Sequence, residues 1–221
     1  QRQQCLLENA TKVLAITDSI KAKFQPICPK EITAIYDGVD VNEYLLPVRR
    51  VLENKNISIL MTGRIAPGKG QLDSIKAVEK LFNEGYKNLS LKIVGGIGDE
   101  EYYRELKKYV SDKKLEFVDF LEFTNDLKVI REKSDIGLTC STFEALGRVT
   151  IENMLSSMLA IGTNTAGTSE IITDYKTGFL YKPGDYEELA EKILLAINNR
   201  DLSNSIIRNA YYEAQERFDN K

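Results

Sequence analysis

The segment GRIAPGKG, residues 63–70, combines glycines with two cations in a pattern suited to binding phosphate. It follows the apolar run ISILMT and matches the P-loop pattern GxxxxGK[ST] except at the last position. Gly70 stands there in place of the Ser or Thr that ligates magnesium. A P-loop ATPase also needs an acid at the end of a second apolar strand, whereas Asp99 lies in a Gly-rich turn. The sequence therefore argues against an ATPase.

Arg64 and Lys69 are the two cations of this segment. We expect Arg64 at the carboxyl end of a strand and Lys69 in the first turn of the following helix. A lysine there is disfavoured by about 0.3–1 kcal/mol because it faces the positive end of the helix dipole. An anion held between the two cations and the helix amides would remove that conflict. The alternative is a Gly/Pro turn with two solvated cations, but phosphate binding without a metal fits better.

The segment STFEALGRVTIENM, residues 141–154, places two acids on either side of a glycine. We expect Glu144 in a loop and Glu152 on the second turn of a helix that starts just after Gly147. The amides at such a helix start form an anion site, to which Thr150 would add a hydroxyl. The acids would then accept hydrogen bonds from sugar hydroxyls. Their other interpretation is stabilisation of the helix dipole, which suits Glu144 better than Glu152. The four amides are those of Leu146, Gly147, Arg148 and Val149.

Two further loops are less specific. In LKIVGGIGDEE, residues 91–101, the dinucleotide pattern GxGxxG read from Gly96 puts Glu101 in the place of the third glycine. A dehydrogenase is therefore disfavoured, although a tight turn beside a flat ligand still fits. In TNTAGTSEIITD, residues 163–174, Glu170 lies among small residues near a short helix. Ligand contact and a simple acid in a helical turn both explain Glu170.

Composition places the chain among ordinary globular proteins. Of its 221 residues 43% are hydrophobic and 29% charged, and the net charge is −3. The Lys and Arg residues are scattered, which argues against nucleic acid as a partner because that needs a basic stripe. No apolar stretch approaches the roughly 20 residues of a membrane span. Three cysteines without a CxxC pair favour a reducing cytoplasm, and the lack of histidine excludes any mechanism that needs an imidazole from this chain.

Short apolar runs alternate with helix-length amphipathic segments along most of the chain. Strands are expected over residues 13–17, 32–35, 57–62, 91–94, 116–120, 136–139, 159–163 and 179–181. Helices are expected over residues 69–83, 100–110, 127–133, 149–157, 186–198 and 203–217. This alternation predicts an α/β protein with a Rossmann-like, doubly wound parallel sheet, which binds ligands at the carboxyl ends of its strands.

A change in composition suggests the domain organisation. Residues 37–56, DGVDVNEYLLPVRRVLENKN, are rich in turn-forming and charged residues and lie between two strand patterns. We interpret them as an interdomain linker. Residues 1–36 are then the end of a preceding N-terminal domain, and residues 57–221 form the ligand-binding domain.

Together these motifs resemble the C-terminal half of a GT-B glycosyltransferase of family 4, the retaining enzymes of glycosyl transferases group 1. The family pattern GR…KG is matched by Gly63, Arg64, Lys69 and Gly70. Its acidic signature, two glutamates with seven residues between them and a glycine among those seven, is matched by Glu144, Gly147 and Glu152. Weaker likenesses cover residues 13–24, 35–44, 120–127 and 166–193.

The resemblance implies a role for each of these residues. Arg64 and Lys69 would hold the diphosphate of a nucleotide sugar and stabilise the charge of the leaving group. Glu144 would contact hydroxyls of the transferred sugar, which makes these three residues the expected catalytic set. Glu152 would bind the ribose hydroxyls. The remaining implied donor-binding residues are Gly63, Gly95, Phe120, Leu121, Leu146, Gly147, Arg148, Val149 and Thr150, with Phe120 and Leu121 beside the base.

As a whole, the resemblance implies transfer of a sugar, with retention, from a UDP- or GDP-type donor to a glycan, lipid or protein acceptor, as in polysaccharide biosynthesis. No metal and no other cofactor would be needed. The acceptor would bind to an N-terminal domain, so this fragment alone should bind donor weakly and not turn over. The expected location is the cytoplasm or the inner face of the membrane, as a peripheral protein. Glu122, in place of a usual glycine, departs from the family pattern near the base.

Two other classes of function stay open. A non-catalytic module that binds nucleotide sugars would keep the cations Arg64 and Lys69 but would not need Glu144. A GT-B phosphorylase or epimerase would reuse the sheet, yet the phosphorylases need a cofactor-bearing lysine and the epimerases rely on histidine, which this chain lacks.

Overall fold

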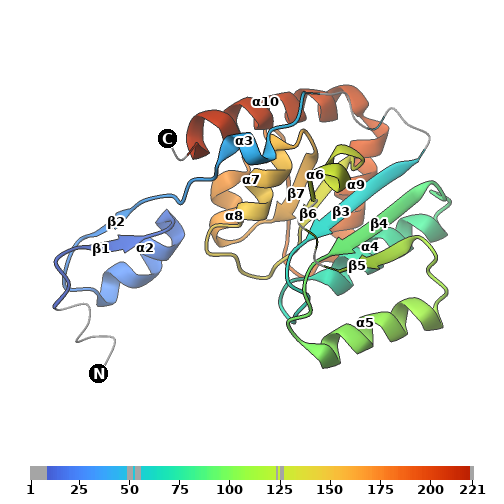
Figure 1. Ribbon diagram of the computed structural model, residues 1–221, viewed down its shortest axis with the longest axis horizontal. Helices are drawn as coiled ribbons and strands as arrows, with labels where there is room; N and C mark the ends of the chain where they lie inside the picture. Colours follow the sequence, from blue (N-terminus) through green and yellow to red (C-terminus); the bar gives the residue numbers. More distant parts are fainter. Residues whose placement is uncertain (1–8, 49–51, 53–55, 123, 125–126, 220–221) are drawn as a thin grey trace.

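Figure 1 shows the computed structural model of the protein, which describes residues 9–48, 52, 56–122, 124 and 127–219. A parallel sheet of six strands forms its centre, in the order β5-β4-β3-β6-β7-β8. The predicted α/β, doubly wound parallel sheet is therefore confirmed. Its strands are β3 (Ile57–Thr62), β4 (Leu89–Val94), β5 (Val118–Leu121), β6 (Ile136–Thr139), β7 (Leu159–Thr163) and β8 (Phe179–Tyr181).

Helices cover both faces of this sheet, which is why its strands are continuous apolar runs. One apolar cluster takes in side chains of α4, α5 and α9. A second contains side chains of α3, α7, α8 and the end of α10. The helices are α4 (Gln71–Asn83), α5 (Glu100–Asp112), α6 (Leu127–Glu132), α7 (Arg148–Leu155), α8 (Ala166–Ile171), α9 (Tyr186–Asn198) and α10 (Arg200–Phe218).

The strand order changes direction beside β3. The chain runs outward from β3 to β4 and β5, and then returns to place β6 on the other side of β3. The loops that follow β3 and β6 therefore diverge at one edge of the sheet. A crevice at this kind of switch point is where doubly wound sheets bind ligands.

The start of α4 corrects the expected helix over residues 69–83. The helix begins at Gln71, so Lys69 lies in the loop before it and not in its first turn. Gly70 precedes the helix in the left-handed conformation, with φ 77°. A Cβ atom at Gly70 would lie 2.1 Å from the carbonyl oxygen of Cys140. Only glycine permits this contact, and it fixes where the helix can start.

A small β-α-β unit precedes the sheet. Strands β1 (Val13–Ala15) and β2 (Ile32–Ala34) pair in parallel, and α2 (Asp18–Phe24) and the short 3₁₀ helix η1 (Gln25–Ile27) connect them. The strand expected over residues 13–17 is thus too long, because Thr17 caps α2 by accepting a hydrogen bond from the amide of Ile20.

The segment expected as a linker has its own short helix, α3 (Val41–Tyr44), which packs against α7. Asp40 caps it by accepting a hydrogen bond from the amide of Asn42. Residues 49–51 and 53–55 of the segment lie outside the described residues. In the part of the chain that the structure describes, no helix is both long enough and apolar enough to cross a membrane.

Candidate functional site

Two adjoining cavities lie at the switch point of the sheet. The larger cavity has a volume of about 600 Å³ and the smaller one about 310 Å³. Both are lined by Thr62, Gly63 and Arg64 at the end of β3 and by Val149 at the start of α7. Because these residues face both cavities, one elongated ligand could occupy the two together.

The smaller cavity contains the pair Lys69 and Glu144. The ammonium of Lys69 lies 2.6 Å from Oε1 of Glu144. The hydroxyl of Ser141 donates a hydrogen bond to the same oxygen, also at 2.6 Å. The loops that carry these residues are joined by a bond of 2.9 Å from the amide of Thr142 to the carbonyl of Gly68. The structure thus brings together two of the three expected catalytic residues, although 75 positions separate them.

The start of α7 forms another wall of the smaller cavity. Gly147 precedes the helix with φ 85°, and the cavity is lined by all four residues whose amides were expected to face an anion. The first N–H groups of a helix have no intrahelical carbonyl to bond, so they are available to an anion. Thr150 points elsewhere, because its buried hydroxyl lies 3.0 Å from that of Thr139 and shares a hydrogen bond with it.

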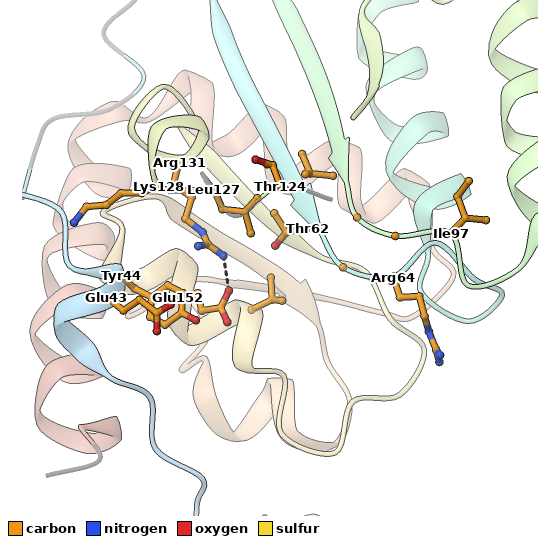
Figure 2. Close-up of a pocket in the computed structure, with 15 residues that line it drawn as sticks. Glu43, Tyr44, Thr62, Arg64, Ile97, Thr124, Leu127, Lys128, Arg131 and Glu152 are labelled. Carbon is orange, nitrogen blue, oxygen red and sulfur yellow. Dashed lines mark hydrogen bonds and ion pairs between the residues drawn. The ribbon is translucent and has the colours of Figure 1, made fainter. Parts of the chain in front are cut away.

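The larger cavity contains Glu152, on the second turn of α7 as expected. Its Oε2 accepts a hydrogen bond from Nη2 of Arg131, on α6, and the two groups form an ion pair. Figure 2 shows this pair with Tyr44 and Glu43 of α3 close beside it. The guanidinium of Arg131 also lies over the ring of Tyr44, 5.2 Å from its centroid. Burial raises the pKa of Tyr44, and the charge of Glu152 adds to the effect.

Arg64 lies where the two cavities meet, but its side chain does not extend toward Glu152. In Figure 2 its guanidinium points away from the ion pair of Arg131 and Glu152. Its stem lies against Gly98, where an added Cβ would be 2.5 Å from Cγ and Cδ of Arg64. The carbonyl of Arg64 accepts a hydrogen bond of 3.1 Å from the side chain of Gln71. A contact between Arg64 and a diphosphate therefore stays a prediction.

The remaining expected donor residues divide into two groups. Gly63 and Gly95 line the larger cavity, and their chains approach so closely that a Cβ at Gly95 would lie 1.9 Å from the carbonyl oxygen of Gly63. Among the described residues, those that line the cavities do not include Phe120 or Leu121. Phe120 packs edge-on against Tyr103, with ring centroids 5.5 Å apart.

Several residues of the larger cavity were not among the expected donor-binding residues. They are Glu43, Tyr44, Thr62, Val94, Gly96, Ile97, Thr124, Leu127, Lys128 and Arg131. For Arg131 the sequence does contain a signal. It falls four residues after Leu127 and one after Ile130, so it occupies the apolar face of its helix. A charged residue at such a position needs a partner, and Glu152 is one such partner.

Two further observations concern the chemistry of the site. Among the residues that the structure describes, no three His, Cys, Asp or Glu side chains gather closely enough to hold a metal. Cys140 lines the smaller cavity, but burial raises the pKa of its thiol to about 12. The Cys140 thiol therefore stays protonated at neutral pH and is a poor nucleophile.

Comparison with known proteins identifies the family. The model of the family described as glycosyl transferases group 1 matches residues 47–213. The chain belongs to this family. Among curated relatives, the capsular polysaccharide biosynthesis glycosyltransferase CapM of Staphylococcus aureus is 26% identical over 95% of the chain and 58% of its own length. The chain thus spans somewhat more than half of that relative.

Solved structures agree with this assignment. The structure of HepE from Anabaena in complex with UDP is 26% identical, with a TM-score of 0.87 over 97% of this chain and 61% of that one. The C-terminal domain of a glycosyl transferase group 1 family protein from Francisella tularensis has a TM-score of 0.71 at 23% identity, over 83% of this chain and 100% of that one. The group 1 fold implied by the resemblance, that of the C-terminal half of a GT-B glycosyltransferase, is therefore confirmed.

Proposed function

We propose that this chain is the donor-binding part of a retaining glycosyltransferase that transfers a sugar from a UDP- or GDP-type nucleotide sugar to a glycan, lipid or protein acceptor. One observation carries the proposal. The pair Lys69 and Glu144 lies in one cavity and Glu152 in the adjoining one, with the end of β3 between them. This spacing suits a ligand that has a sugar and phosphates at one end and a nucleoside at the other.

In this proposal the smaller cavity binds the diphosphate and the transferred sugar. Lys69 and the amides at the start of α7 neutralise the phosphates, and Arg64, which also lines this cavity, adds a second cation. Preorganised positive groups of this kind stabilise the charge that develops on the leaving phosphate. Glu144 then accepts hydrogen bonds from the sugar, and Glu152 from the ribose. HepE supports the choice of a nucleotide sugar as the ligand, because it has been solved with UDP-glucose and is 26% identical to this chain.

The proposed chemistry requires neither a metal nor a covalent intermediate. Lys69 and the helix amides supply the positive charge that magnesium supplies in other phosphate sites. In a front-face displacement the bond between the anomeric carbon and the phosphate oxygen breaks, and the acceptor hydroxyl attacks that carbon from the side on which the phosphate leaves. The departing phosphate accepts the proton of the acceptor hydroxyl. That course retains the anomeric configuration without a nucleophilic side chain.

The acceptor site and the cellular setting are proposals of the same kind. We assign residues 1–36 to the end of an N-terminal domain that binds the acceptor, and residues 57–221 to the donor domain. The fragment should therefore bind donor without transferring sugar. The proposed location is the cytoplasm or the inner face of the membrane, where nucleotide sugars meet lipid-linked acceptors.

Calorimetric titration of the wild-type protein and three variants with UDP, GDP and their glucose or mannose esters tests the function. Lys69→Ala should weaken the binding of both diphosphates and nucleotide sugars about tenfold or more, because a charge-assisted bond is lost. Glu144→Ala should weaken only the nucleotide sugars, because the diphosphates lack the sugar that Glu144 contacts.

Lys108→Ala, which removes an exposed lysine on α5, is the matched control and should leave every affinity unchanged. If Glu144→Ala has no effect on a nucleotide sugar that the wild-type chain binds, the chain is a non-catalytic binding module. Wild-type protein that binds none of these ligands would contradict the proposed function itself.

A further inference from the structure

Arg131 is a charged side chain in a position where the fold would otherwise place an apolar one. Its side chain is only 3% exposed. The same face of α6 carries Leu127 and Ile130, which pack into an apolar cluster with Leu60 and Val94 of the central strands. The guanidinium extends past this cluster into the larger cavity, where it faces Glu152 (Figure 2).

The guanidinium is held between two other elements. On one side Nη2 donates a hydrogen bond to Oε2 of Glu152, on α7, and on the other side lies the ring of Tyr44, on α3. Glu152 itself lines the larger cavity. Arg131 therefore restrains a carboxylate that would face a ligand in the cavity.

A purely structural ion pair is a poor explanation for this arrangement. Removing two charges from water costs about as much as their attraction returns, and well-packed apolar residues do the same structural work at least as well. The pair also lines a cavity at the switch point of the sheet, where ligands bind. Holding Glu152 in one rotamer before a ligand arrives removes the entropy that a free glutamate loses on binding.

We propose that Arg131 is a positioning residue that sets the affinity for the ribose of the donor by orienting Glu152 toward the ribose hydroxyls. This inference rests on the proposed function. It adds to that function a residue that acts through Glu152 and that touches neither the transferred sugar nor the phosphates.

The test compares UDP and GDP with their 2′,3′-dideoxy forms, which lack both ribose hydroxyls. Wild-type protein should bind the normal form of at least one diphosphate more tightly than the dideoxy form. Arg131→Met should reduce that preference about tenfold and leave the affinity for the dideoxy form within about twofold of the wild-type value. Isothermal titration gives all four affinities for each protein.

Two variants separate the role of Arg131 from simple electrostatics. Lys133→Met removes an exposed cation just after the same helix and outside the lining of both cavities, and it should leave the ribose preference unchanged. In a Glu152→Gln background, Arg131→Met should cause no further loss of preference, because Arg131 acts through that carboxylate.

Arg131→Lys keeps a cation near Glu152 and serves if Arg131→Met does not fold, as judged by its thermal unfolding midpoint. It should lose part of the ribose preference, about threefold, and none of the affinity for the dideoxy form.

Three results would overturn the inference. Equal weakening of both forms would show a structural role only, and the proposed function would stand. A larger loss for the dideoxy form would show that Arg131 contacts the base or the phosphates directly. Wild-type protein that binds neither diphosphate would overturn the proposed function and this inference together.

Discussion

Close backbone contacts at glycines shape the cavities at the scale of single residues. Gly95 follows β4 and Gly63 follows β3. The two backbone segments are joined by a hydrogen bond of 3.0 Å from the amide of Gly63 to the carbonyl of Val94. Gly96, the next residue, has open space where a Cβ would be. Both glycines line the larger cavity, but a side chain would clash at Gly95 and would be accommodated at Gly96.

Substitution of each glycine by alanine should therefore have different effects on the free energy of unfolding. In Gly95→Ala the new methyl group would lie 1.9 Å from the carbonyl oxygen of Gly63, so the strand ends must move apart. We expect this substitution to lower the free energy of unfolding by about 1–3 kcal/mol or more, as overpacking does. Gly96→Ala is the matched control and should change that free energy by less than about 1 kcal/mol. Urea unfolding measures both, and equal effects would contradict the close contact.

At the scale of elements, Glu170 of α8 joins the β1-α2-β2 unit to the central sheet. Its carboxylate accepts hydrogen bonds from the amides of Asp18 and Ser19, at 2.9 and 2.7 Å, and so caps the start of α2 from the other side of the interface. The hydroxyl of Tyr36 donates to the same carboxylate. The sequence left open whether Glu170 contacts a ligand or stabilises a helix, and the described contacts are those of a cap.

The titration of Glu170 gives this contact a pH dependence. Burial by itself would raise the pKa of Glu170, but hydrogen bonds from Ser19, Tyr36 and Asp18 outweigh it and lower the pKa below its ordinary value of 4.5. The stabilisation is therefore fully present above pH 4.5 and is lost as the pH falls through the lower, folded-state value.

Glu170→Gln should accordingly weaken the contact by about 1 kcal/mol at neutral pH, because the charged acceptor of two amides is lost. The exchange of the Asp18 and Ser19 amide hydrogens, followed by NMR, measures the loss locally. The difference between variant and wild type should shrink as the pH falls through the folded-state pKa of Glu170, which lies below 4.5, because the wild-type carboxylate becomes protonated there.

Glu116→Gln, at an exposed position outside this interface, is the matched control and should leave the exchange of these amides unchanged. A difference in exchange that stays constant as the pH falls through the folded-state pKa of Glu170 would show that the charge of Glu170 does not stabilise this contact.

At the scale of the whole molecule, the site depends on both halves of the sheet. The residues proposed to face the phosphates come from the loop after β3, the loop after β6 and the start of α7, while the proposed nucleoside end adds α3, α6 and the end of β4. A ligand bound across these elements stabilises the entire fold by mass action. Leu14, in the middle of β1, and Ile35, just after β2, are 59% and 54% exposed.

A thermal-shift measurement checks the proposed division of the site. At a concentration about 100 times its dissociation constant, UDP or GDP should add about 2.7 kcal/mol of stability and raise the unfolding midpoint by several degrees. Uridine and guanosine at the same concentration should raise it far less, because the positive groups of the smaller cavity have no phosphate to bind. A nucleoside that raises the midpoint as much as its diphosphate would contradict the assignment of the smaller cavity.

The local sequence pattern was sufficient to predict the elements whose residues interact mainly with near neighbours in the sequence. The apolar run at β3, the helix of α9 and the position of Glu152 on α7 all follow from periodicity and capping. The start of α4 did not follow, because Gly70 is required by the carbonyl of Cys140, which lies 70 residues further along. The helix α3 also did not follow, since its four residues carry too weak a period to be recognised.

The sequence by itself determined the class of the fold, the family and the candidate residues, because strand and helix periods and short motifs are properties of neighbouring positions. Only the tertiary structure decided which of these residues meet. In the structure Lys69 forms an ion pair with Glu144, and Arg131 forms one with Glu152. The side chain of Arg64 points away from the pair of Arg131 and Glu152. The hydroxyls of Thr150 and Thr139 share a hydrogen bond. The physical reason is that a contact between distant segments depends on how strands are ordered and how closely their loops can approach, and neither is encoded in local spacing.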